Sequence, residues 1–390
     1  MSETGLELRY GMNPHQRASV RASGGSLPVR VLNGTPSAIN LMDAVNSWQL
    51  VRELRQATGL PAAASFKHVS PSGAGLGLPL SGTLCKAYAV EDLELTPLAE
   101  AYTRARGTDP LCSYGDCAAL SDPLDVQTAR LLKREVSDVL VAPGYDPKAL
   151  EIVRQKKGGT YLVLQVDPDY APPPVEERDL FGMTLVQDRN TYVPDLNDLG
   201  TIVTASKTIT DAARRDIALG LLVLKYTQSN SIVLTWQGQT LGVGAGQQSR
   251  IHCAGIAADK ADRWYLRQHP KVLSLRFQSG VRRPDRNNYI NAVVSGNSDD
   301  LLARESAKML ASEPVHLSPE ERPDWLQTME GTTLGSDGLI PFRDTIDRAH
   351  HSGVRYIAQT GGALRNEEVI CAANEYDMVM VSTGTRLFHH

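Results

Sequence analysis

The sequence is short of cysteines and of long apolar runs, and each shortage excludes a class of protein. None of its five cysteines pairs with another at the C-x-x-C spacing of zinc and redox motifs. Free thiols in a reducing compartment are the simplest interpretation, so we expect a cytoplasmic protein. No stretch approaches the roughly 20 apolar residues that cross a bilayer, and no apolar core of a signal peptide follows Met1. We therefore expect neither a membrane protein nor a secreted one.

The sequence also has no large excess of basic over acidic residues. The formal net charge is -4, so no global basic field would attract nucleic acid or an anionic membrane. Neither a G-x-x-x-x-G-K-[ST] phosphate loop nor a full G-x-G-x-x-G fingerprint occurs, and no H-E-x-x-H or paired Cys/His set indicates zinc or another metal. A local basic pocket for a single phosphate group remains open.

The length of 390 residues predicts two or three domains, because it exceeds one ordinary hydrophobic core. Three consecutive prolines within 167–176 predict an extended connector. We place the boundary after it, which gives domains 1–190 and 191–390. The polar, proline-containing stretch of about 269–330 predicts a small helical insertion in the second domain.

Apolar periodicity predicts helices that alternate with strands in both domains. The predicted helices are 39–57, 125–135, 211–226, 259–268, 345–351 and 366–374. The predicted strands are 62–66, 138–142, 161–166, 355–359 and 378–382, with a hairpin of 231–236 and 239–244. This alternation is typical of an α/β fold, although we see no repeat between the halves at the level of residues.

Lys67 and His68 stand where the buried strand 62–66 ends, before the stretch SPSGAG, which predicts a turn. Neighbouring side chains on a regular strand point to opposite faces, but at a strand end both can reach one pocket. A lysine there supplies a point charge for a phosphate or a developing oxyanion, and a histidine supplies a base. A solvated lysine beside a structural histidine is the alternative, and it stays open.

Other polar stretches are RYGMNPHQ from Arg9, KYTQSNS from Lys225, GVGAGQQSRIHC from Gly242, SDGLIPFRD from Ser336 and TRLFHH at the end. Their arginines give forked donors that suit phosphate, and a carboxylate beside an aromatic ring suits a planar heterocycle. The Gly-rich stretch is equally typical of a backbone loop near a ligand and of a hairpin end. Each stretch alone is also typical of a plain turn or helix start. Together they favour a small, planar, anionic ligand.

These stretches, with SFKHVSPSGAG, resemble the transformylase portion of the bifunctional enzymes that join AICAR formyltransferase to IMP cyclohydrolase in purine biosynthesis. The resemblance runs from about Leu8 to His390. It implies two cytidine-deaminase-like three-layer α/β domains with a helical insertion, and a homodimer whose active sites are shared between subunits. Because only eight residues precede Arg9, we expect a transformylase without the cyclohydrolase domain, with a separate IMP cyclohydrolase acting downstream.

The resemblance implies that the formyl group of 10-formyltetrahydrofolate is transferred to the 5-amino group of AICAR. It implies catalytic roles for His68 as proton acceptor, for Lys67 in stabilising the transition state, and for Asn230. The implied nucleotide-binding positions are Arg9, Tyr10, Asn40, Gly115, Asp138, Arg250, Leu339 and Arg386. The implied folate-binding positions are Ile251, Pro341, Asp344, Ala363 and Leu364. A monovalent cation such as K+ also belongs to the resemblance, whereas zinc does not.

The chain departs from the family pattern at the walls of this pocket. Leu339 and Ile340 stand where two phenylalanines are usual, and Leu111 and Tyr114 replace a methionine and a phenylalanine. Two other functions stay open: a purine-nucleotide-binding sensor without catalysis, and a transformylase that uses formate and ATP. The sequence gives no nucleoside-triphosphate motif for the latter.

Overall fold

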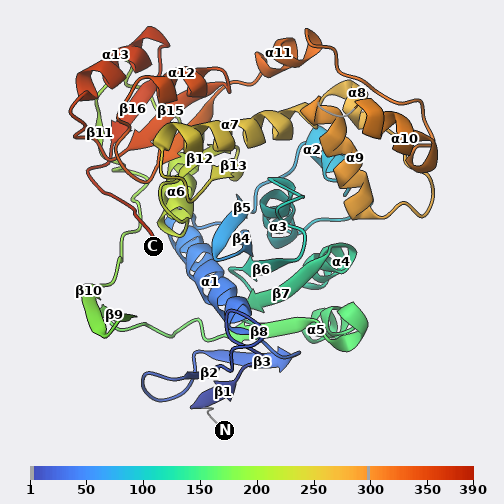
Figure 1. The fold of residues 1–390 in the computed structure, drawn as a ribbon, viewed down its shortest axis with the longest axis vertical. Coiled ribbons are helices and arrows are strands. Elements are labelled where there is room, and N and C mark those ends of the chain that lie inside the picture. The colour runs from blue at the N-terminus through green and yellow to red at the C-terminus, as the bar shows by residue number, and fades with distance from the viewer. Residues whose placement is uncertain (1–3, 297–298) are drawn as a thin grey trace.

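The computed structural model describes residues 4–296 and 299–390. Within them, one mixed sheet of twelve strands runs in the order β11-β16-β15-β14-β12-β13-β5-β4-β6-β7-β8-β3 (Figure 1). Its first half consists of β3 (Val29–Asn33), β4 (Ala62–Lys67), β5 (Ser70–Leu76), β6 (Asp116–Leu120), β7 (Ser137–Ala142) and β8 (Leu162–Val166). Its second half consists of β11 (Thr201–Ile202), β12 (Ile232–Trp236), β13 (Gln239–Gly244), β14 (Thr332–Ser336), β15 (Val354–Gln359) and β16 (Val379–Ser382).

The two halves of the sheet repeat one topology. In the first half β4 pairs antiparallel with β5 and β6, whereas β6, β7 and β8 run parallel. In the second half β12 pairs antiparallel with β13 and β14, whereas β14, β15 and β16 run parallel. The edge strands agree as well, because β3 and β11 are antiparallel to β8 and β16. The predicted α/β structure of both halves is confirmed, while the boundary near residue 190 stays a prediction.

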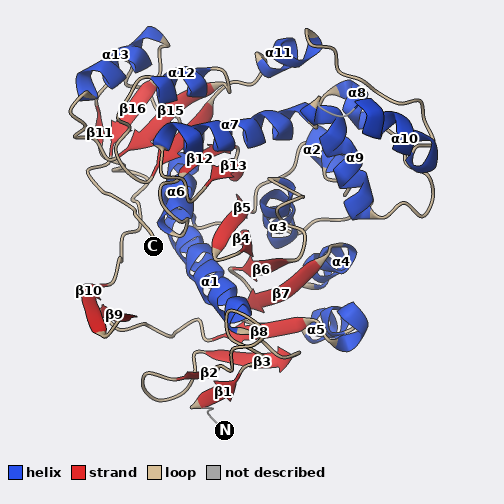
Figure 2. Cartoon of the chain, viewed as in Figure 1, coloured by secondary structure: helices blue, strands red, loops and turns tan. Residues whose placement is uncertain are grey.

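Helices cover both faces of the sheet and complete three layers (Figures 1 and 2). On one face, α1 (Ala38–Thr58) and α6 (Asp211–Lys225) lie together over a core that includes Trp48 and Leu222. The other face carries α3 (Pro97–Gly107), α4 (Val126–Arg134), α5 (Pro147–Arg154), α7 (Arg250–Leu266), α12 (Asp344–His350) and α13 (Asn366–Glu375). Tyr102 and Trp264 belong to the core on that face.

The halves meet at a narrow seam between β5 and β13. Gly75 and Gln239 are the one pair that faces across it in the register of the sheet. Behind the seam, Lys225 of α6 donates hydrogen bonds of 2.8 and 2.9 Å to the carboxylate of Glu53 in α1. Both side chains are buried, and a buried ion pair of this kind fixes the position of one helix against the other.

The seam strands carry glycines at alternate positions, each facing a helix. A Cβ on Gly73 would lie 2.2 Å from the carbonyl oxygen of Ala105 in α3, and one on Gly242 would lie 2.1 Å from that of Ala257 in α7. Both distances are far shorter than van der Waals contact, so only glycine lets each helix approach its strand this closely. The Gly-rich stretch from Gly242 is typical of either a ligand-binding loop or a hairpin end. Its first residues belong to strand β13 of a hairpin.

Smaller elements surround these layers. The insertion consists of α8 (Pro270–Leu273), α9 (Arg283–Ser295), α10 (Asp299–Met309) and α11 (Glu321–Leu326), with a small core of its own that includes Tyr289. The remaining elements are β1 (Gly5–Glu7), β2 (Ser19–Arg21), α2 (Gly82–Ala87), a 3-10 turn (Lys156–Gly159), β9 (Val175–Leu180) and β10 (Met183–Asp188). Among the described residues, no helix has the length and apolar character needed to cross a membrane.

Most predicted elements are present, but two predictions are wrong. The stretch SPSGAG belongs to strand β5 rather than to a turn, and the helix predicted from residue 259 begins at Arg250. The predicted elements do not include α3 and β6. From Ala101 to Gly107, α3 is buried on every side, so it lacks the polar stripe on which a periodicity argument depends.

We expect Gly242→Ala to destabilise the protein by about 1–3 kcal/mol, because the added methyl group meets backbone that cannot rotate away. The shift of the urea midpoint measures this cost. Gly255→Ala, in α7 with open space at its Cβ position, is the matched control, and it should stabilise the helix by up to about 1 kcal/mol. Equal effects of the two substitutions would contradict the close packing of α7 on β13.

Candidate active site

Lys67 and His68 lie at the tight turn that joins β4 to β5. Lys67 pairs with Ser70, which leaves His68 and Val69 as a two-residue loop. Both loop residues have left-handed backbone angles, with φ of 53° at His68 and 61° at Val69. Two-residue hairpins of this kind favour Asn-Gly, and a β-branched residue is a clear outlier in this conformation. Something else in the structure must therefore hold the turn.

Asp43 of α1 holds it. The Asp43 carboxylate accepts a hydrogen bond of 2.6 Å from the backbone N–H of Val69. Asp43 follows the helix start at Ser37, whose side chain and backbone form a capping box with Asn40. Burial raises the pKa of Asp43 to about 6, although the Val69 hydrogen bond and the neighbouring His68 favour the carboxylate. The start of α1 thus fixes the end of β4.

The same device occurs in the second half, without the lysine and histidine. The β12–β13 hairpin turns at Gln237 and Gly238, with φ of 50° and 76°. Asp216 of α6 accepts hydrogen bonds of 2.8 and 2.7 Å from their backbone N–H groups. Trp236 and Gln237 occupy the places of Lys67 and His68. The fold therefore needs an acidic anchor under each turn, but it does not need a lysine and a histidine on it.

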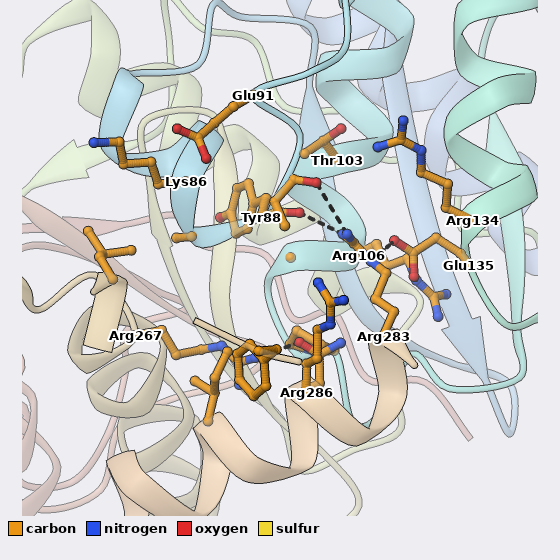
Figure 3. A pocket seen from close by; sticks show the side chains of 18 of the residues that line it. Lys86, Tyr88, Glu91, Thr103, Arg106, Arg134, Glu135, Arg267, Arg283 and Arg286 are labelled. Carbon is orange, nitrogen blue, oxygen red and sulfur yellow. Dashed lines mark hydrogen bonds and ion pairs between the residues drawn. The ribbon is translucent and has the colours of Figure 1, made fainter. Parts of the chain in front are cut away.

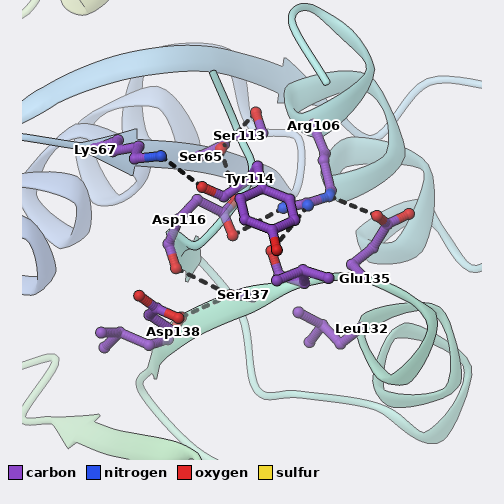
Figure 4. Close-up of polar contacts among 12 residues, drawn as sticks. Ser65, Lys67, Arg106, Ser113, Tyr114, Asp116, Leu132, Glu135, Ser137 and Asp138 are labelled. Atoms are coloured by element: carbon purple, nitrogen blue, oxygen red, sulfur yellow. Dashed lines mark hydrogen bonds and ion pairs between the residues drawn. The ribbon is translucent and has the colours of Figure 1, made fainter. Parts of the chain in front are cut away.

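Lys67 is held against a loop between α3 and β6. Its Nζ donates a hydrogen bond of 2.6 Å to the carbonyl oxygen of Tyr114 (Figure 4). The next residue, Gly115, has φ of 76°, and a Cβ there would lie 3.5 Å from the carboxylate of Asp138. Asp138, which is half exposed at the start of β7, pairs with Lys157. Lys67, Gly115 and Asp138 therefore lie next to one another.

A buried ion network supports this loop from below (Figure 4). Asp116 is fully buried, and it accepts from Ser65 Oγ at 2.6 Å and pairs with Arg106 at 2.8 Å. Arg106 Nε in turn donates to Glu135 at 2.7 Å. Removing one member of such a network leaves an uncompensated buried charge. The network therefore keeps the loop under Lys67 in one position.

Arg9 and Tyr10 attach to the start of α1. The N–H of Arg9 bonds to the carbonyl of Pro36, and the N–H of Ala38 bonds to the carbonyl of Tyr10. The Arg9 guanidinium donates to the Tyr10 hydroxyl at 3.1 Å. Both side chains thus lie at the helix end that also carries Asn40. The structure brings together seven predicted site residues here, which we call the first-half group: Arg9, Tyr10, Asn40, Lys67, His68, Gly115 and Asp138.

Asn230 and Arg250 form the centre of a second gathering. Arg250, at the start of α7, donates to the Asn230 side-chain oxygen at 2.9 Å and to Ser336 Oγ at 3.1 Å. It also pairs with the fully buried Asp337. The Asn230 amide donates to the carbonyl of Gln247 at 3.0 Å. Arg250 is buried and committed to protein partners, so its clearest role in this structure is to orient Asn230.

The C-terminal tail runs beside this pair. The N–H of Leu387 bonds to the carbonyl of Asp337 at 2.8 Å, and His389 exchanges backbone and side-chain bonds with Ser229. These bonds place Arg386 next to the Asn230 region, where its guanidinium carbon lies 4.6 Å from the centre of the Phe388 ring. A chain end is usually frayed, but this one is fixed by its hydrogen bonds.

The remaining predicted positions follow the ends of β14 and β15, except for Ile251, which is the second residue of α7. Leu339 and Leu364 are exposed, whereas Ile340 is fully buried in the core. Asp344 begins α12, and its carboxylate accepts from the N–H of Thr345. These positions make up the second-half group: Asn230, Arg250, Ile251, Leu339, Pro341, Asp344, Ala363, Leu364 and Arg386.

Both groups lie at the same end of the central strands of the sheet. β4 pairs antiparallel with β5, β5 with β13, and β13 with β12, so β4 and β12 run in opposite directions. The end of β4 and the start of β12 therefore lie on the same side of the sheet. Two strands separate them, which puts their axes about 14 Å apart at a spacing of about 4.8 Å. Among the described residues, no hydrogen bond or ion pair joins the two groups. Nor do the described residues contain a cluster of three or more potential metal ligands.

Sequence reasoning missed three residues that shape these groups: Asp43, Arg106 and Asp337. Asp43 stands one helical turn after Asn40 and faces the same way, which is a weak signal. Arg106 and Asp337 act through partners far away in the chain, and no local pattern marks them.

The fold is that of a three-layer α/β protein, and its predicted site residues gather in two polar, arginine-containing groups where strands of the sheet begin or end. Residues 1–260 match the family model described as AICARFT/IMPCHase bienzyme. The bifunctional purine biosynthesis protein PurH of Ruegeria pomeroyi is 32% identical over 388 residues, which are 98% of this chain and 59% of that protein. A PurH of Cereibacter sphaeroides is 30% identical over the same share. The chain belongs to the AICARFT/IMPCHase family, and it spans about three fifths of the length of these relatives.

We expect Asp43→Asn to remove a pH-dependent part of the stability. Burial raises the pKa of Asp43 from 3.8 to about 6, so the folded protein binds this proton more tightly than the unfolded chain does. The resulting stabilisation is present below about pH 4 and is lost as the pH rises through about 6. Between about pH 4.5 and 7.5 the wild type should lose about 2 kcal/mol of unfolding free energy relative to the variant. A difference that is constant with pH in urea unfolding, or that grows in favour of the wild type, would contradict this assignment.

Proposed function

We propose that this chain transfers the formyl group of 10-formyltetrahydrofolate to the 5-amino group of AICAR, giving formyl-AICAR and tetrahydrofolate in purine biosynthesis. The observation that carries the proposal is the Lys67–His68 pair on a left-handed turn anchored by Asp43. The equivalent hairpin of the second half makes the same turn without a lysine or a histidine. The fold therefore does not require Lys67 and His68, which favours a catalytic role for them. Family membership supplies the reaction type.

The amine of AICAR is a weak nucleophile, because its lone pair is conjugated with the imidazole ring. The site must orient it on the formyl carbon, accept its proton and stabilise the tetrahedral oxyanion. His68 is exposed on the turn and accepts that proton as the new C–N bond forms. Lys67 supplies positive charge and a proton for the folate nitrogen when its bond to the formyl carbon breaks. Asn230, held by Arg250, donates to the oxyanion or to the carboxamide.

Substrate binding divides between the two groups. Arg9, Tyr10 and Arg386 offer donors for the nucleotide phosphate, and Asn40, Gly115, Asp138 and Leu339 line the rest of the nucleotide pocket. The folate lies against Ile251, Pro341, Ala363 and Leu364, with Asp344 accepting from the N–H groups of the pterin. The exposed Leu364 supports the placement of the folate, because an exposed apolar side chain suits a flat aromatic ligand.

The functional unit in this proposal is a homodimer in which the first-half group of one chain faces the second-half group of the other. The separation of the two groups within one chain supports it, since the axes of β4 and β12 lie about 14 Å apart and no hydrogen bond or ion pair joins the groups among the described residues. A monovalent cation such as K+ belongs to the proposal on the strength of the family resemblance alone. A cytoplasmic location belongs to it because free thiols suit a reducing compartment.

His68→Ala tests the proposal. We expect AICAR to bind with unchanged affinity by calorimetry, while single-turnover formyl transfer falls by about 10²–10⁴-fold, because a proton acceptor is lost. Gln237→Ala, at the equivalent position of the other hairpin, is the matched control and should leave turnover unchanged.

Three results would count against the reaction. An unchanged rate in His68→Ala would reject the residue assignment. Binding of AICAR by the wild type without turnover would favour the sensor, and turnover with formate plus ATP in place of the folate would favour the other donor.

A further inference from the structure

A polar cavity lies between the helical insertion and the helices α2, α3 and α4 of the first half (Figure 3). Its walls come from α2, α3 and α4 on one side and from the end of α7, α8 and α9 on the other. Its volume is about 770 Å³, within the range of pockets that enclose a nucleotide-sized ligand. None of its lining residues belongs to the first-half or second-half group. We call it the insertion cavity.

The insertion cavity is basic in a chain whose formal net charge is -4. Three acidic side chains line it: Glu91, Asp92 and Glu135. Six basic side chains line it: Lys86, Arg106, Arg134, Arg267, Arg283 and Arg286. Such a local excess of one sign inside a recess raises the local concentration of small ions of the opposite sign.

Two of the three carboxylates are already occupied by arginines. Asp92 pairs with Arg134 at 2.6 Å. Glu135 is shared between Arg106 at 2.7 Å and Arg283 at 2.6 Å. Two arginines are left over. In the part of the chain that the structure describes, no carboxylate lies within ion-pair distance of either Arg267 or Arg286.

Arg267 is the more informative of the two, because only 8% of it is exposed. It donates one hydrogen bond, from Nη2 to the side-chain oxygen of Asn287 at 2.8 Å, which leaves most of its N–H groups without a protein acceptor. Burial lowers the pKa of Arg267 to about 10, so the side chain is still charged at neutral pH. A buried cation without a counter-ion is costly, and a bound anion removes that cost.

Arg286 lies on the face of α9 that also carries Arg283 and Asn287, at helical spacings of three and four residues. Its Nε donates to the carbonyl of Val281 at 2.9 Å, and its guanidinium carbon lies 5.6 Å from the centre of the Phe277 ring. The two terminal nitrogens have no hydrogen-bond partner among the described residues. Figure 3 shows Arg267 and Arg286 entering the cavity from the side of the insertion.

We propose that the insertion cavity binds a small molecule that carries two or more oxyanion charges, with Arg267 and Arg286 as its forked donors. Guanidinium groups match both phosphate and carboxylate oxygens in paired geometry, so these two chemistries share the site. This site does not depend on the proposed formyl transfer, because it shares no residue with that site.

Calorimetric titration of the full chain with inorganic pyrophosphate tests the proposal. We expect the wild type to bind, and Arg267→Met and Arg286→Met each to weaken this binding by at least about tenfold, because a charge-assisted hydrogen bond is lost. Methionine retains much of the apolar stem, and Arg286 is only half buried, so this second variant should fold even if the first does not. Arg276→Met, which removes an exposed arginine of the same insertion outside the cavity, is the matched control.

The proposed nucleotide pocket can also attract pyrophosphate, so the titrations are repeated in the Arg386→Met background. Binding that persists there and disappears when Arg267→Met is added belongs to the insertion cavity. Displacement by citrate identifies a site that accepts carboxylates, whereas its absence identifies one that is selective for phosphate. The proposal is overturned if the wild type binds neither anion, or if both cavity variants bind pyrophosphate as tightly as Arg276→Met does.

Discussion

The hydrogen bond from the Val69 N–H to the Asp43 carboxylate is the interaction on which the candidate site depends. It ties the start of α1 to the end of β4, and it holds two residues in a backbone conformation that their side chains disfavour. Lys67 and His68 owe their position to this bond. The Asp43 carboxylate is buried where it makes this hydrogen bond, and burial raises its pKa. The charge of Asp43 therefore depends on pH.

The repeated topology explains why this anchor exists at all. In each half, the helix that precedes the hairpin has an aspartate as its sixth residue, Asp43 or Asp216, and each aspartate caps a hairpin turn. In the second half the turn is only structural, and the polar residues gather instead around Asn230 at the start of β12. The two halves therefore place different polar residues, Lys67 and His68 in one and Asn230 in the other, on the same side of one sheet. Glycines at matching positions of β5 and β13 let the helices behind them pack closely.

Sequence patterns predict those features of the structure that depend on residues close together in the chain. A buried apolar run that ends in Lys67 and His68 is visible in the sequence, and so are most helices and strands of both halves. Glycine and proline usually mark a turn, so the sequence predicts one at SPSGAG. In the structure Gly73 and Gly75 instead lie in a strand, where their missing side chains make room for α3, a helix from a later part of the chain. Asp337, Arg106 and the unpaired Arg267 follow only from contacts between distant segments. No single sequence pattern encodes whether the two groups of site residues meet across two chains, as we propose.

Recovery of activity from two inactive chains is the most direct measurement of whether the reacting centre is built from both groups. His68→Ala and Asn230→Ala each remove one group's contribution, and a mixed dimer of the two retains one intact site out of two. Random mixing of equal amounts is therefore expected to restore about a quarter of the wild-type formyl transfer. Mixtures that remain as inactive as the separate variants, although the chains exchange, would contradict a centre shared between the turn of one chain and the Asn230 region of the other.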